Sequence, residues 1–106
     1  MDVQIKNNYT FVGVNEYSFE KFKLEWKALT SNHLVLEISE NLNIDDAIIS
    51  LLLIVTADLN QKGMSFVTIK PSVNIDDFPE NINIVPTLQE AEDMIEMESI
   101  ERDLGF

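Results

Sequence analysis

The segment at residues 43–63, NIDDAIISLLLIVTADLNQKG, constrains the fold more than any other part of the chain. Between residues 47 and 59, ten of thirteen residues are apolar, so the polar face of an ordinary surface helix is missing. Asp45 suits a helix N-terminus, and Gly63 suits the left-handed conformation that ends a helix. A bilayer requires about 20 apolar residues, and this run is shorter. The pattern therefore predicts the core helix of a globular domain, covered on nearly every side.

Length and charge limit the classes of protein that need consideration. A chain of 106 residues has the size of one domain, and 45% hydrophobic residues are typical of a globular protein despite a net charge of -12. Residues 71–106 hold ten acidic residues and one basic residue. Such a chain repels nucleic-acid phosphates and anionic membrane surfaces, so neither is an expected partner. A protein partner with a basic surface is the electrostatic possibility that is left open.

The sequence has no cysteine, which excludes disulfides, thiolate metal ligands and a cysteine nucleophile. The N-terminal residues MDVQIKNNYT form no apolar signal segment. The cytoplasm is therefore the expected compartment.

The first two thirds of the chain predict a hairpin followed by a crossover unit. Apolar and polar residues alternate before the turn residues Asn7 and Asn8, and strand-favouring residues follow them. This pattern indicates a β-hairpin at residues 3–14. Ser18 then begins an amphipathic helix, whose apolar stripe contains Phe19, Phe22, Trp26 and Leu29. Apolar runs at residues 34–38 and 64–69 flank the core helix, and this strand–helix–strand order predicts parallel neighbouring strands.

The last third predicts a short edge strand and a long acidic helix. Ile82, Ile84 and Val85 indicate the strand, and Thr87 with Glu90 forms a capping box before a helix at residues 88–104. Its expected core face consists of Leu88, Ala91, Met94, Ile95 and Glu98. The helix is longer than a small sheet, so its end, with Ile100, Leu104 and Phe106, should overhang and either fold back or bind another protein.

No catalytic or metal-binding constellation is present in the sequence. His33 has no second ligand or nucleophile nearby and is expected to be a solvated loop residue. The repeated Asn-Ile-Asp-Asp at residues 43–46 and 74–77 lacks the spacing of a calcium loop and is typical of turns and helix starts. We therefore expect no enzyme activity, no metal and no cofactor.

The order of these elements resembles the STAS-like domains of bacterial anti-sigma factor antagonists. The likeness rests on HLVLEISENLNIDDAIISLLL, SFVTIK and INIVPTLQEAEDMI. It implies an α/β fold with a STAS-like mixed sheet of about five strands and three main helices over residues 1–106. In that family the loop before the central helix ends in Asp-Ser-Ser-Gly, and a partner kinase, itself the anti-sigma factor, phosphorylates one serine. Here the match reads Asp45-Asp46-Ala47-Ile48, so the resemblance implies docking without that phosphorylation.

A narrower likeness concerns the C-terminal segment. Short STAS-like chains that end in PTLQEAEDxIEMExIERDLGF are associated with bacterial ribonuclease Z annotations, as a companion protein. The present chain ends in PTLQEAEDMIEMESIERDLGF. The resemblance implies an enzyme of the ribonuclease Z type as one possible partner.

Together these observations predict a non-enzymatic protein-interaction or regulatory module. Its expected partner-binding residues at the start of the core helix are Asn43, Ile44, Asp45, Asp46, Ala47, Ile48 and Ile49. Those in the tail are Ile100, Leu104 and Phe106. Two alternatives stay open: a homodimeric structural or adaptor protein that pairs through the apolar helix face, and a small ligand-binding or catalytic domain with a carboxylate site.

Overall fold

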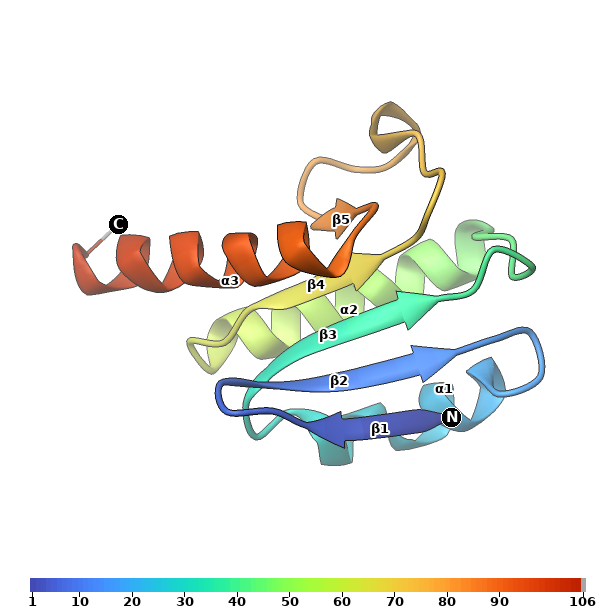
Figure 1. Cartoon of the computed structure of the whole chain (residues 1–106), viewed down its shortest axis with the longest axis horizontal. Coiled ribbons are helices and arrows are strands. Elements are labelled where there is room, and N and C mark those ends of the chain that lie inside the picture. The colour runs from blue at the N-terminus through green and yellow to red at the C-terminus, as the bar shows by residue number, and fades with distance from the viewer. Residues whose placement is uncertain (106) are drawn as a thin grey trace.

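Five strands form one mixed sheet in the order β1-β2-β3-β4-β5 in the computed structural model, which describes residues 1–105 (Figure 1). The strands are β1 (Asp2–Ile5), β2 (Tyr9–Val14), β3 (His33–Ile38), β4 (Phe66–Ile69) and β5 (Ile84–Val85). β1 is antiparallel to β2, and each later pair is parallel. The predicted hairpin and crossover unit are confirmed. The α/β fold with five strands and three helices is compatible with the expected STAS-like class.

Helices cover both faces of this sheet (Figure 1). The α-helices are α1 (Phe19–Glu25), α2 (Asp46–Gln61) and α3 (Leu88–Asp103), and the short 3-10 helices are η1 (Trp26–Leu29) and η2 (Ile75–Asp77). α1 and α2 pack against one face, and α3 packs against the other face over β4 and β5. The central strands are therefore buried on both sides.

The alternation of side chains in β3 shows how the two layers of core arise. Leu34 and Leu36 point toward α1 and α2, whereas Val35 points toward α3, and all three are fully buried. Phe22, Leu52 and Leu59 belong to the larger cluster, together with Leu34 and Leu36. The smaller cluster beneath α3 contains Tyr9, Val35, Val67, Ile69, Val85, Ala91 and Ile95.

The core helix α2 begins and ends as its sequence predicts. The Asp45 side chain accepts a hydrogen bond from the Ile48 N–H at 2.9 Å, and Gly63 takes a φ of 74° after the last turn. The expectation that α2 is covered nearly all round is wrong. Its outer side is exposed, and the residues there are Ala47, Ser50, Ile54, Ala57 and Gln61. Most of these side chains are small or polar, so exposure costs little hydrophobic free energy.

Local details differ from the prediction at the first helix. The Ser18 side chain makes no capping bond, and Asn15 Oδ1 instead accepts from the Tyr17 and Ser18 N–H groups at 2.9 and 3.0 Å. The amide of Asn15 reaches these donors because the chain turns sharply after β2. The expected single helix also tightens into η1 at Trp26.

Further differences occur around β5 and α3. Thr87 Oγ1 accepts from the Glu90 N–H at 3.2 Å, as predicted, but Glu90 bonds to the Thr87 hydroxyl rather than to its backbone N–H. β5 contains only two residues, so Ile82 is buried but lies before the strand. Leu88, expected on the core face of α3, is 38% exposed.

The end of α3 runs beyond the amino ends of the neighbouring strands (Figure 1). Ile100 and Leu104 are exposed, so this part of the tail does not fold back onto the core. Phe106 lies outside the described residues. None of the helices within residues 1–105 combines the length and apolar composition required to cross a bilayer.

The fold predicts a large difference between two leucines. Leu52 in α2 is fully buried, whereas Leu24 in α1 is 84% exposed. Leu52→Ala should lower the free energy of unfolding by about 2–5 kcal/mol, because it leaves a cavity in the main core. Leu24→Ala, the matched control, should change it by less than about 0.5 kcal/mol. Urea denaturation followed by circular dichroism measures both values, and equal effects would contradict the described packing of α2.

Candidate functional site

A groove lies between α1 and the start of α2 and has a volume of about 260 Å³. It is lined by Glu16, Phe19, Glu20, Lys23, Leu42, Asn43, Asp45, Ala47, Ile48 and Leu51. Two helices, the β2–α1 turn and the β3–α2 loop therefore contribute to one concave surface. A groove of this size accommodates one or two side chains of another protein rather than a large ligand.

The floor of the groove is apolar because the core helices reach the surface there. Phe19 and Ile48 are each only 7% exposed, and Leu42 and Leu51 are half-buried. The aromatic stripe of α1 supplies Phe19, and the nearly all-apolar α2 supplies Ile48 and Leu51. The groove is thus an extension of the main core toward solvent.

The rim of the groove is acidic. Glu16, Glu20 and Asp45 are exposed carboxylates among its lining residues, and Asp46 is an exposed neighbour. The lining contains one cation, Lys23, whose Nζ lies 3.7 Å from Glu20 Oε1. The remaining carboxylates give the rim a net negative charge, which favours a basic ligand.

The β3–α2 loop is held in place by Lys70, which directly follows β4. Lys70 Nζ donates to the carbonyl oxygens of Ser39 and Glu40 at 3.0 and 3.3 Å. The Leu42 N–H donates to the Ser39 carbonyl at 3.2 Å, and Asp45 caps α2. These bonds fix the loop before any partner arrives, which reduces the entropy lost on binding.

The structure brings together part of the expected partner-binding set. Asn43, Asp45, Ala47 and Ile48 line the groove, whereas Asp46 lies beside it. The remaining two residues, Ile44 and Ile49, are half-buried against the main core. Sequence reasoning missed the contribution of α1, because the packing of α1 against α2 depends on contacts distant in sequence.

The tail residues of the expected site lie elsewhere. Ile100 belongs to α3 and Leu104 directly follows it, and α3 packs on the sheet face opposite α1 and α2 (Figure 1). Phe106 is outside the described residues. The start of α2 and the end of α3 therefore form two separate surfaces.

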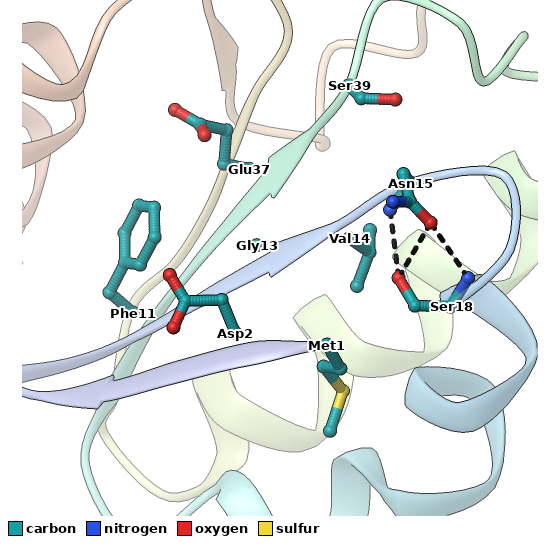
Figure 2. A pocket seen from close by; sticks show the side chains of 9 residues that line it. All are labelled: Met1, Asp2, Phe11, Gly13, Val14, Asn15, Ser18, Glu37 and Ser39. Atoms are coloured by element: carbon teal, nitrogen blue, oxygen red, sulfur yellow. Dashed lines mark hydrogen bonds between the residues drawn. The ribbon is translucent and has the colours of Figure 1, made fainter.

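A second, wider hollow of about 520 Å³ opens where α3 leaves the sheet uncovered (Figure 2). The strand register aligns Asp2, Gly13 and Glu37 in one row, and Gly13 has no side chain to fill the space between the two carboxylates. Phe11 forms one side of the hollow. Residues 1–105 contain no group of three side chains able to hold a metal ion. The hollow is open and offers no nucleophile paired with a base.

His33 belongs to a polar network rather than to a solvated loop, so the expectation for this residue is wrong. It is half-buried at the start of β3, and its Nδ1 accepts the Ser65 N–H at 2.8 Å. Arg102 Nη1 donates to Ser65 Oγ at 3.1 Å and pairs with Glu98 at 3.8 Å. Asn83 Nδ2 donates to Glu98 Oε2 at 2.8 Å. The network joins α3 to the amino ends of β3 and β4.

Burial lowers the pKa of His33 below its usual value of 6.5; the charge of Arg102 contributes in the same direction, and Glu98 opposes it. At the other end of α3, Tyr9 donates to Glu92 Oε2 at 2.7 Å, and burial together with this bond raises the pKa of Tyr9 to about 12. Both ends of α3 are thus tied to the sheet by hydrogen bonds.

No known protein-family model and no curated protein matches the chain.

The His33 geometry predicts a pH-dependent loss of stability. Protonated Nδ1 cannot accept the Ser65 N–H, and the pKa of His33 is lower in the folded than in the unfolded chain. The stabilisation is therefore complete above about pH 6.5, the unfolded pKa, and decreases as the pH falls toward the folded pKa. The amide oxygen of the variant His33→Asn can accept the Ser65 N–H without titrating. This variant should therefore lack the His33 contribution to the pH dependence of the free energy of unfolding, measured by urea denaturation below pH 6.5. Parallel pH profiles for the two proteins would contradict the role given to His33.

Proposed function

We propose that this chain is a non-enzymatic protein-interaction module of the STAS-like type, and that the groove between α1 and α2 is its docking surface. The observation that carries the proposal is an apolar floor with an acidic rim at the start of the central helix. Apolar pockets surrounded by charged residues are characteristic of sites that hold an anchor side chain of a partner. The resemblance of the element order to that of anti-sigma factor antagonists supports the same location.

The chemistry of the groove defines the segment that it would bind. One or two apolar side chains would enter between Phe19 and Ile48, because these floor residues lie at the edge of the core. Lys or Arg residues beside that anchor would meet Glu16, Glu20 and Asp45. The partner is therefore a protein with an exposed basic and apolar segment, either a kinase-like regulator or an enzyme.

Serine phosphorylation has no acceptor at the corresponding positions of this loop. In the alignment with the Asp-Ser-Ser-Gly loop of anti-sigma factor antagonists, Asp46 and Ala47 occupy the positions of the two serines. Ser39 lies before the loop, and Ser50 lies within α2 on its exposed side. We infer that binding at this groove does not depend on phosphorylation of the chain.

The repeated tetrapeptide supplies a matched pair of variants for testing the groove. Asp46 stands beside the groove, whereas Asp77 occupies the same place in the second Asn-Ile-Asp-Asp, in the exposed η2. Glu20→Lys/Asp46→Lys reverses one charge at the rim and one beside the groove, and Asp76→Lys/Asp77→Lys reverses two charges elsewhere. Asp45 is left intact because it caps α2.

We expect affinity capture from a native lysate to lose the partner with Glu20→Lys/Asp46→Lys and to retain it with Asp76→Lys/Asp77→Lys. The predicted loss is at least about tenfold, which corresponds to about 1.4 kcal/mol. Quantitative mass spectrometry of the captured proteins measures the ratio, and circular dichroism verifies that both variants are folded. Equal capture by both variants would reject the groove as the docking surface.

A further inference from the structure

Helix α3 has one face fixed against the sheet. Ala91 and Ile95 are buried there, and Tyr9–Glu92, Asn83–Glu98 and Ser65–Arg102 hydrogen bonds hold the helix along its length. These contacts define the rotation of α3 about its axis. They also define which side chains must face solvent.

The solvent side of the last turns carries an apolar stripe. Met97, Ile100 and Leu104 are 55%, 52% and 66% exposed, and their spacing of three and four residues aligns them on one side of the helix. α3 also extends past the strands at this end (Figure 1). A contiguous apolar stripe on an exposed helix is typical of a binding surface.

Acidic residues border this stripe on both sides. At 100° per residue, Glu96 and Asp103 lie on one side of the stripe and Glu101 on the other. All three are exposed. Arg102, the one basic residue in residues 88–103, points away toward Ser65. No cation of α3 therefore offsets the acids beside the stripe.

We propose that Met97, Ile100 and Leu104 form a second docking surface, and that it inserts into a groove of another protein with an apolar floor and a Lys/Arg rim. This is the helix-in-groove mode of recognition, with α3 as the helix. Charge complementarity selects a basic partner, since the acids beside the stripe would meet cations on either side of the groove.

A second copy of this chain does not fit that description. Its groove between α1 and α2 has an apolar floor, but Glu16, Glu20 and Asp45 at the rim would repel the acids of α3. The lysines of α1, Lys21 and Lys23, lie between Glu20 and Glu25 and provide no basic rim. The occupant is thus a different protein.

The α3 surface does not depend on the groove proposed above. The two lie on opposite faces of the sheet and share no residue. A module with both surfaces can hold two proteins at once.

The test uses the isotope-labelled full chain and a peptide made of two covalently linked, parallel amphipathic helices of leucine and lysine, whose leucines line a groove between the helices and whose lysines form its rim. A scrambled peptide of the same composition has the same charge without the apolar groove. Two-dimensional amide NMR locates the binding site by residue. We expect the helical peptide to shift the amide signals of residues 94–104, to bind at least about tenfold more tightly than the scrambled peptide, and to weaken as salt is raised.

Two variants make the outcome decisive. Met97→Gln/Ile100→Gln/Leu104→Gln should weaken binding by at least about tenfold, whereas Leu24→Gln/Ile54→Gln, which alters two exposed apolar residues elsewhere, should leave it unchanged. Equal binding of the scrambled peptide, or unchanged binding by the triple variant, would overturn the α3 proposal. Shifts confined to residues 42–51 would also overturn it while supporting the groove. A dimer in light scattering that the triple variant abolishes would show that the occupant is a second copy.

Discussion

The burial of β3 and β4 on both faces is the constraint on which the rest of the structure depends. Leu34 and Leu36 require cover from α2, and Val35 and Val67 require cover from α3. One helix is about 10 Å wide, so α3 covers only part of a five-stranded sheet. The hollow over Gly13 arises where this cover ends. The groove beside α2 arises where α1 and α2 separate at the other face.

The elements could be predicted from sequence because their signals are local. Asp45, Gly63 and Thr87 act within a few residues of their positions, and the apolar runs of β3 and β4 define buried strands without reference to other segments. The sites depend on contacts distant in sequence. His33 and Ser65 meet through the β3–β4 pairing, and Asp2 and Glu37 align through two strand registers that no local pattern specifies. The participation of Phe19 and Glu20 in the groove has the same origin.

The repeated Asn-Ile-Asp-Asp shows how context decides between identical local sequences. Both copies use a side-chain oxygen to accept a backbone N–H: Asp45 from Ile48 in the first copy, and Asn74 from Asp76 in the second. The first continues into apolar residues that α2 can bury, and a helix of 16 residues results. The second is followed by Phe78 and Pro79, and Pro79 restricts the preceding residue to extended conformations, so η2 ends after three residues. The cap begins a helix, but burial determines its length.

The acidity of the chain has a common consequence for both proposed surfaces. Each combines an apolar contact with a negative border, at the groove through Glu16, Glu20 and Asp45, and on α3 through Glu96 and Glu101. A net charge of -12 attracts basic proteins from a distance and raises their rate of encounter, without selecting between the two surfaces. Selection must then come from shape, because the groove receives a side chain whereas α3 presents a ridge. Partners of similar charge would thus be sorted by whether they offer a protruding anchor or a cleft.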